Sequence, residues 1–368
     1  MRAMMPAPAL TLMAVPSRVL LLLAVCWLVL TGPGAAQETD AAPQTPVGSP
    51  AAPTPASPPP LSAPLGTPVE ESNPLPAPTG QPPSGALKTE VEATARAYGA
   101  FQRGYYLTAM DLALSEAAKG NARAQTLVAE LFAEGLGVAR NMDEAAFWYE
   151  QAARSGDPSA QFKFAIMLFE GRHVPRDPKR SAELMLKAAD GGNAFAQFNH
   201  AQSVVAEKPG STGIREALPY FEKSAEQGVR DAQYALAQIY MNTDGISEDK
   251  RATARSWIER AARGGYDTAQ LDLAIWLIDG IGGDKNYDDG FRWMQLAAMG
   301  GNVVAQNRLA ILYINAVGTR GDPVEAGKWY ILSKRAGYDD RGLDDFYQGL
   351  TSEEQKAAID AANRFRPQ

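Results

Sequence analysis

The sequence predicts an all-α fold, a solenoid of about seven helix-turn-helix units followed by a C-terminal capping helix. An Ala-Gln pair recurs at intervals of 36 or 37 residues. A further alanine lies five residues after the alanine of each pair, and a glycine lies four residues before the alanine of each pair. Three coincident registers with a period of this length indicate stacked structural units. The pairs begin at Ala124, Ala160, Ala196, Ala232, Ala269 and Ala305, the second alanines are Ala129, Ala165, Ala201, Ala237, Ala274 and Ala310, and the glycines are Gly120, Gly156, Gly192, Gly228, Gly265 and Gly301, with Gly337 keeping the period.

Residues 1–36 have the pattern of an export signal peptide. Val19–Leu30 is a run of 12 apolar residues after Arg18, and Gly34-Ala35-Ala36 supplies the small residues that a signal peptidase requires. Twelve helical residues rise about 18 Å, which is short of the roughly 30 Å hydrocarbon core of a bilayer. We therefore expect cleavage after Ala36 and a periplasmic or secreted protein. The alternative is an uncleaved signal that anchors the protein in the inner membrane.

Residues 37–85 are predicted to be a disordered, proline-rich linker. Of the 26 prolines in the chain, 15 lie between Pro43 and Pro83. The segment has few side chains that could fill a core, so it cannot offset the entropy lost on ordering. Prolines at this density favour an extended polyproline II conformation. We expect a spacer between the export signal and the repeats.

The charge and cysteine content exclude several functional classes. Without residues 1–36 the chain carries 33 Lys and Arg against 42 Asp and Glu, a net charge of −9. A chain this acidic is not expected to bind nucleic acid, and we expect membrane contact only transiently, through the signal segment. Cys26 is the only cysteine in the sequence. Residues 37–368 therefore have no disulfide, thiol nucleophile or cysteine metal ligand.

The first helix of each unit is predicted to begin near the Ala-Gln pair. Apolar residues fall at offsets 0, +4, +5 and +8 from the first alanine, as in Ala269, Leu273, Ala274 and Leu277. This spacing is typical of one face of an α-helix. The alanines at offsets 0 and +5 lack bulk, so we expect a neighbouring helix to approach closely there.

The second helix of each unit carries start and stop signals. Asp322-Pro323-Val324-Glu325 places an N-cap residue, a first-turn proline and a glutamate in order, and Asn141–Glu144 has a similar pattern. The recurring glycine can end the helix in the left-handed conformation. A large side chain lies eight residues before each glycine, and four of the six tryptophans occupy this position, which indicates core packing. The seven residues are Leu112, Trp148, Leu184, Tyr220, Trp257, Trp293 and Trp329.

The array has predicted boundaries and one irregular unit. We place the repeats at residues 86–340, with a partial first unit at Thr89–Gly120. Residues 341–368 are expected to form the capping helix, which Thr351–Glu354 opens and which covers the last apolar face. In the third unit Glu207 replaces a loop glycine and Lys208–Gly213 interrupts the connection. That interruption puts regular packing in doubt there and suggests a hinge or an insertion site.

The stretches Ala124–Gly156 and Ala305–Gly337 show the Ala-Gln pair, the apolar-Ala pair, Trp-Tyr and the closing glycine in order. They resemble Sel-one-like (SLR) repeats, a class of tetratricopeptide-like helical repeats, and the resemblance extends from about Glu90 to Arg366. It implies a right-handed superhelix with a concave groove that holds partner proteins. Exported bacterial relatives are often adaptors or regulators, and some control exopolysaccharide production through a membrane sensor.

A partner-binding groove is predicted on the first helices. Offsets +2, +6 and +9 lie roughly opposite the core stripe on a helical wheel and would be polar if they met only water. Many are apolar or aromatic instead, which suggests an open groove for a helix or an extended peptide. The alternative is that neighbouring first helices bury these residues against one another. The predicted groove residues are Phe162, Ile166, Phe169, Phe198, Tyr234, Met241, Leu271, Ile275 and Ile278.

No residue pattern predicts a catalytic, cofactor or metal site. His200 falls at offset +4, where other units have apolar residues, so we interpret it as a substituted core residue; His173 lies in a loop. The acidic stretch Asp284–Gly290 resembles a calcium loop weakly, and helix capping explains its acids better. The acid pairs at 339–340 and 344–345 are interpreted as a solvated connection to the cap.

These features predict a non-catalytic protein-protein interaction scaffold or signalling adaptor of the bacterial cell envelope. The expected partner is a protein, such as a membrane sensor or an envelope assembly, and no cofactor is expected. The alternative is binding or hydrolysis of a carbohydrate, either peptidoglycan or exopolysaccharide. Sugar sites usually combine aromatic platforms with many polar groups, whereas the predicted groove is mostly aliphatic, which favours a protein partner.

Overall fold

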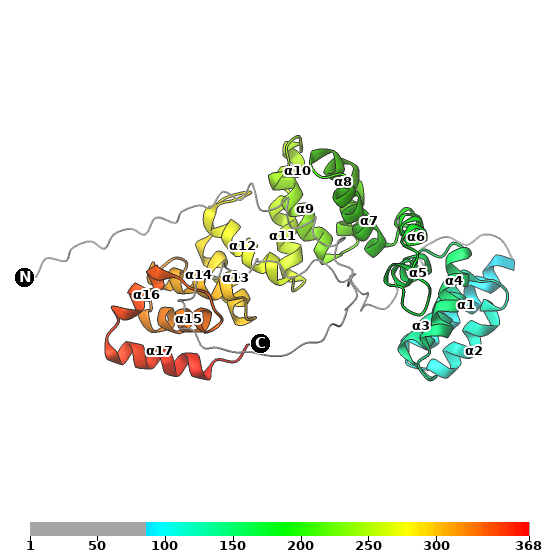
Figure 1. Ribbon diagram of the computed structural model, residues 1–368, viewed down its shortest axis with the longest axis horizontal. Coiled ribbons are helices and arrows are strands. Elements are labelled where there is room, and N and C mark those ends of the chain that lie inside the picture. The colour runs from blue at the N-terminus through cyan, green and yellow to red at the C-terminus, as the bar shows by residue number, and fades with distance from the viewer. Residues whose placement is uncertain (1–85, 368) are drawn as a thin grey trace, which may run out of the picture. The chain divides into compact units, whose positions relative to one another are not determined.

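A computed structural model describes residues 86–367, with side chains from Glu92 onward. All regular elements in this range are α-helices (Figure 1). The predicted signal peptide and proline-rich linker lie outside the described residues. Of the described helices, none is both long enough and apolar enough to cross a membrane.

The helices pair in chain order, from the cyan α1 to the red α17 in Figure 1. Seven pairs form, because the first unit, predicted to be partial, contains two complete helices. The first helices of the units are α1 (Ala86–Gln102), α3 (Ala122–Glu134), α5 (Pro158–Glu170), α7 (Ala194–Glu207), α9 (Arg230–Asn242), α12 (Asp267–Asp279) and α14 (Val303–Ile314). The second helices are α2 (Tyr106–Ala117), α4 (Met142–Arg154), α6 (Pro178–Asp190), α8 (Ser211–Glu226), α10 (Glu248–Ala252) with α11 (Ala254–Arg263), α13 (Tyr287–Met299) and α15 (Pro323–Arg335).

Each second helix packs on the first helix of its own unit and on the first helix of the next unit. The all-α solenoid of stacked helix pairs is therefore confirmed. Alanines at the recurring positions provide the close approach that this stacking needs. Those at offsets 0 and +5 are fully buried in all six Ala-Gln units.

The glutamine of the Ala-Gln pair joins successive units. Its side-chain amide donates from Nε2 to the main-chain carbonyl oxygen eight residues earlier, at the end of the preceding second helix. Each of these carbonyls also accepts from the backbone amide of the recurring glycine three residues later, so the glutamine supplies an additional donor at the helix end. The sequence showed that this glutamine recurs with the repeat period, but its hydrogen bond between successive units was not predicted. The six bonds run from Gln125, Gln161, Gln197, Gln233, Gln270 and Gln306 to Ala117, Ala153, Ala189, Ala225, Ala262 and Ala298, over 3.1–3.3 Å.

The predicted caps are confirmed. Asp322 accepts hydrogen bonds from the backbone amides of Val324 and Glu325 at the start of α15. Asn141 does the same at the start of α4. The seven recurring glycines all have φ between +85° and +96°. This is the left-handed region that favours glycine.

The tryptophans at the shared repeat position are less uniform than predicted. Trp329 is fully buried and meets the ring of Phe365 edge-on. The side chains of Trp148, Trp257 and Trp293 are only partly buried. Arg260, for example, lies over the exposed side of Trp257, 4.5 Å from the ring centroid.

The third unit is a regular helix pair despite its altered connection. Helices α7 and α8 pack against each other as the other pairs do, so the expected loss of regular packing is not observed. The connection between α7 and α8 is short, and the backbone at Gly213 lies close against Lys208. A Cβ at Gly213 would be 1.9 Å from the Lys208 carbonyl oxygen.

The C-terminal region contains two helices rather than the single capping helix expected. α16 (Arg341–Gln348) forms where a solvated connection was predicted, and Asp340 caps it by accepting from the amide of Leu343. α17 (Ser352–Arg364) opens with the predicted Thr351–Glu354 capping box and packs on α15. α17 therefore covers the face of α15 that a further first helix would otherwise occupy.

Candidate functional site

Three of the predicted groove residues at offset +2 are buried. The relative exposures of Phe162, Phe198 and Leu271 are 0%, 3% and 9%. The ring of Phe162 stacks on Phe195 at the start of the next first helix, with centroids 6.1 Å apart and planes inclined by 23°. The ring of Phe198 meets Phe221 of the second helix α8 edge-on, with centroids 5.9 Å apart. The prediction that these three residues line an open groove is therefore wrong, and the alternative, burial against a neighbouring first helix, is observed for Phe162.

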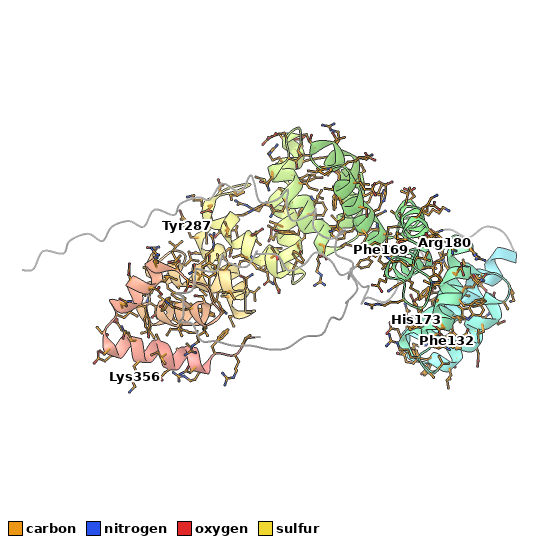
Figure 2. All side chains as sticks on the ribbon, in the orientation of Figure 1. Phe132, Phe169, His173, Arg180, Tyr287 and Lys356 are labelled. Carbon is orange, nitrogen blue, oxygen red and sulfur yellow. The ribbon has the colours of Figure 1, made fainter. Side chains whose placement is uncertain are left out.

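Residues at offset +9 face the loops and the second helices. Ile278 lies against Gly290 of α13, where a Cβ would be 2.6 Å from its Cγ1. The sulfur of Met241 lies beside Gly282, in the loop of the next unit. Phe169 (Figure 2) is 49% exposed. The guanidinium carbon of Arg176 lies 5.8 Å from the centroid of its ring.

Offsets +3 and +6 remain accessible to solvent in α5, α7, α12 and α14, whereas Leu127 at offset +3 of α3 and Gln238 at offset +6 of α9 are buried. Residues three apart are neighbours on a helix surface, so the two offsets form one stripe along each helix. The stripe mixes charged, amide and aliphatic side chains, all partly exposed. We define the first-helix stripe as Lys163, Ile166, Asn199, Gln202, Asp272, Ile275, Arg308 and Ile311.

Sequence reasoning found offset +6, with Ile166 and Ile275, but missed offset +3. The helical wheel places offsets +2 and +3 at similar angles from the point opposite the core stripe. The apolar residues at offset +2 were expected to form a binding surface, but they are buried in the protein. Lys163, Asn199, Asp272 and Arg308 at offset +3 were the available signal.

A polar cluster joins the first helices α9 and α12. Asp272 Oδ2 accepts hydrogen bonds from the Tyr234 hydroxyl and from Gln238 Nε2, each over 2.9 Å. Burial raises the pKa of the Asp272 carboxyl, while these hydrogen bonds and the nearby Arg308 act in the opposite direction. Burial also raises the pKa of Tyr266, which lies against Tyr234, to about 12. The predicted groove residue Tyr234 therefore uses its hydroxyl within the protein.

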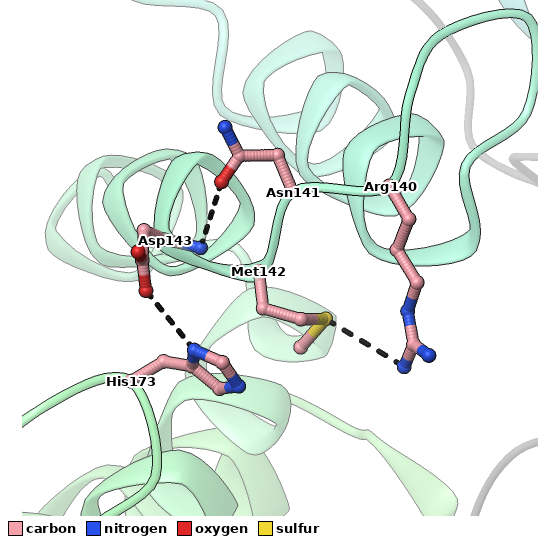
Figure 3. Close-up of a pocket in the computed structure, with 5 residues that line it drawn as sticks. All are labelled: Arg140, Asn141, Met142, Asp143 and His173. Atoms are coloured by element: carbon pink, nitrogen blue, oxygen red, sulfur yellow. Dashed lines mark hydrogen bonds and ion pairs between the residues drawn. The ribbon is translucent and has the colours of Figure 1, made fainter.

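A shallow depression of about 410 Å³ lies between the first two Ala-Gln units (Figure 3). His173 Nδ1 is 3.0 Å from Asp143 Oδ1, and Met142 and Arg140 line the same depression. His173 has φ +62°, and the corresponding positions in four other units are glycines, all with positive φ: Gly137, Gly245, Gly282 and Gly318.

The loops at these positions differ in how closely they approach the preceding second helix. At Gly137 a Cβ would lie 2.8 Å from Tyr106 Cβ, and at Gly318 it would lie 2.1 Å from the Tyr287 carbonyl oxygen. At Gly245 no atom lies within 4 Å of a built Cβ. In the second Ala-Gln unit the imidazole of His173 occupies this position and contacts Asp143.

The other acidic residues singled out from the sequence have structural roles in the described region. Asn286 caps α13 by accepting from the Asp289 amide, so helix capping explains the acids of 284–290. Asp344 accepts from the Tyr330 hydroxyl over 2.6 Å and pairs with Lys334, and these hydrogen bonds lower the pKa of its carboxyl. Between residues 86 and 367, no group of three His, Cys, Asp or Glu side chains is arranged to hold a metal ion.

Comparison with known proteins supports the repeat assignment. The family model for the Sel1 repeat matches residues 122–157, 158–193, 208–229, 230–266, 268–302 and 303–338. Helix α7 falls in the gap between the second and third matches. None of the curated proteins matches the chain significantly.

Two solved structures are similar to the chain. A Sel1 repeat protein from Oxalobacter formigenes is 24% identical, covers 67% of this chain and 99% of its own, and superimposes with a TM-score of 0.53. The protein c5321, a protective antigen of uropathogenic Escherichia coli with an SLR fold, is 25% identical over 75% of this chain and 68% of its own, with a TM-score of 0.49. The first of these likenesses agrees with the solenoid fold.

Proposed function

Because the chain belongs to the Sel1 repeat family, whose members generally act as protein-interaction scaffolds, we propose that it is a non-catalytic scaffold or adaptor of the bacterial cell envelope. The partner is a protein that binds along the first-helix stripe. The observation that carries this proposal is the stripe itself, which recurs in α5, α7, α12 and α14 and remains partly exposed there.

The composition of the stripe indicates the form of the partner. Lys163, Asp272 and Arg308 provide charges of both signs. Asn199 and Gln202 provide amide donors and acceptors, and isoleucines lie between them. A partner segment with mixed polar and apolar side chains, lying across several units, complements such a surface better than a uniformly apolar helix does.

A carbohydrate ligand is less well supported. The tyrosines and polar groups between α9 and α12 are the kind of set that sugar sites use. However, the Tyr234 hydroxyl and Gln238 Nε2 already donate to Asp272. A sugar would have to break these hydrogen bonds to use the same groups, at a cost that the new bonds would have to exceed. A protein partner that contacts the other residues of the stripe can leave these hydrogen bonds in place.

The envelope location is supported by the apolar run at Val19–Leu30 and the small residues that follow it. In this proposal the proline-rich residues 37–85 separate the export signal from the repeats. The partner is then another envelope protein or the periplasmic part of a membrane protein.

Photo-crosslinking tests the proposal. A photoreactive amino acid is placed at Gln202 on the stripe or at Lys356, an exposed residue on the outer side of α17 (Figure 2). Irradiation of intact cells should give discrete crosslinked protein bands with the probe at Gln202 and none with the probe at Lys356. Equal crosslinking at both positions, or crosslinking to glycan alone, would contradict a protein partner on this surface.

A further inference from the structure

One unit places a histidine where the others place a core residue. At offset +4 of the first helix, the residue is apolar and at most 2% exposed in every Ala-Gln unit except the third. In α7 the position holds His200, which is only partly buried. The apolar residues at this offset are Val128, Phe164, Leu236, Leu273 and Leu309.

The imidazole of His200 packs on Tyr220 of α8. The ring centroids are 4.8 Å apart and the planes are nearly perpendicular, at 83°. The Tyr220 hydroxyl in turn donates to Asp190 Oδ1 over 2.9 Å. His200 therefore connects α7, α8 and the end of α6 in the place of an aliphatic contact.

Charged groups surround this contact on the helices packed against α7. Asp190 comes from α6, Glu207 from α7 itself and Glu216 from α8, and all three favour a protonated imidazole. Lys223 lies over the Tyr220 ring at 5.9 Å. Lys208 pairs with Glu216 over 2.7 Å, which reduces the effect of that carboxylate on the imidazole.

Other features reduce the stability of the same unit. Pro219 lies inside α8, where it has no amide hydrogen for the carbonyl of Arg215. The C-cap of α7 is Lys208 with φ −126°, whereas α3, α5 and α12 end in left-handed glycines. Between residues 122 and 338, α7 is also the only described helix that lies outside the family-model matches. The unit formed by α7 and α8 therefore lacks one helical hydrogen bond in α8 and a left-handed glycine at the end of α7.

We propose that the third unit, α7 with α8, is an acid-sensitive joint that opens when His200 takes up a proton, while the units on either side stay folded.

The direction of the pH effect follows from the balance of influences on His200. Burial is the largest, and it lowers the pKa of the imidazole below its ordinary value in spite of the three acids. The opened state has an imidazole pKa near its usual value of about 6.5. Opening is therefore independent of pH above about 6.5. It becomes more favourable as pH falls below that value, and it levels off below the folded-state pKa.

Carboxyl groups with shifted pKa values lie in other units. Burial raises the pKa of Asp157, Asp231 and Asp272, so proton uptake at those groups stabilises the folded state. The pKa values of Glu150 and Asp344 are lowered by their ion pairs, so acid weakens those contacts only below the ordinary carboxyl range of about pH 4, well below the range in which His200 takes up a proton. Since α7 carries Asn199 and Gln202, opening would also remove part of the first-helix stripe; that consequence alone rests on the proposed function.

Hydrogen exchange of the purified chain tests the joint without any partner. After correction for intrinsic rates, amides of α7 and α8 should exchange up to about tenfold faster per pH unit below pH 6.5. Amides of α12 to α15 should show no such increase. Faster exchange in all units together, or no change in α7 and α8, would overturn the proposal.

Two matched variants assign the effect, since the chain has only two histidines. His200→Leu places the residue of three other units in the same position and should abolish the increase. His173→Gly restores the residue of the corresponding loops and should leave it intact. If His200→Leu folds poorly, titration of the imidazole protons in the unsubstituted chain decides the matter, because a His200 pKa at or above 6.5 would refute the mechanism.

Discussion

Gln161 donates a hydrogen bond from its side-chain amide to the carbonyl oxygen of Ala153, 3.2 Å away, and so ties the start of α5 to the end of α4. The same relationship recurs between every pair of successive units from Gln125 to Gln306. At the C-terminus, Gln355 of α17 donates to the carbonyl of Tyr347 over 2.9 Å. The buried glutamine therefore satisfies a helix end and fixes the spacing between units.

Replacing Gln161 by methionine should destabilise the chain by about 0.5–1.5 kcal/mol, because a side chain of similar volume would remove one buried hydrogen bond and leave the Ala153 carbonyl with only its backbone donors near Gly156. Urea denaturation followed by circular dichroism measures the change. Gln348→Met, at an exposed position at the end of α16, serves as the control and should change stability by less than about 0.5 kcal/mol. Equal effects of the two changes would remove the structural role assigned to the glutamine.

The adjacent glycines 300 and 301 should respond differently to alanine. Gly301 has φ +92° with no atom close to a built Cβ, so Gly301→Ala should cost about 1–2 kcal/mol from backbone conformation alone. Gly300 has φ −69°, and its nearest neighbours would make ordinary contacts. Gly300→Ala should therefore be neutral or stabilising by up to about 1 kcal/mol. Thermal unfolding of the two variants checks the contrast, and the opposite order would show that the left-handed cap is not what requires glycine.

The tryptophans at the shared position should not be equivalent. Trp329→Ala should cost about 3–5 kcal/mol, because the indole is fully buried against Phe365. Trp257→Ala should cost clearly less, since Trp257 borders solvent and its covering partner is Arg260. Chemical denaturation of both variants tests this order. Similar losses would mean that partial exposure does not lower the contribution of the residue.

The carboxylate of Asp272 should stabilise the junction of α9 and α12 as a shared acceptor. Asp272→Ala leaves the Tyr234 hydroxyl and Gln238 amide without their partner and should cost about 1–3 kcal/mol. Asp272→Asn keeps an acceptor oxygen and should cost less. Asp279→Ala, at the exposed end of α12, is the control. Equal stability of the Ala and Asn variants in urea titrations would argue against the shared-acceptor role.

Much of the fold could be predicted because its signals are local. Caps such as Asp322, the left-handed glycines and the small alanines each act within one helix or one turn, so a fixed period identifies them. Helix α16 was not predicted, because it has only eight residues and departs from the repeat pattern. Its acids were taken for a solvated connection, whereas Asp340 is a cap and Asp344 binds Tyr330 and Lys334.

The candidate surface was predicted only in part, because its limits depend on distances between units. A helical wheel shows which side of a helix faces away from its core stripe. It does not show how closely the next first helix approaches. Phe162 is buried for this reason, and Phe198 is buried against Phe221 of α8. Ile166 and Ile275, at offset +6, are partly exposed. The carbonyl link made by Gln161 likewise depends on a contact between successive units.

The most direct test of the scaffold proposal is recovery of envelope proteins with a charge-altered stripe. The unsubstituted chain, a Gln202→Arg, Arg308→Glu double variant and a Lys356→Glu control are each used to capture proteins from a solubilised envelope. Circular dichroism first shows that all three are equally helical. The account predicts that a partner is recovered with the unsubstituted chain and with Lys356→Glu, and is lost with the double variant. Recovery of the same proteins at the same level with the double variant would contradict it.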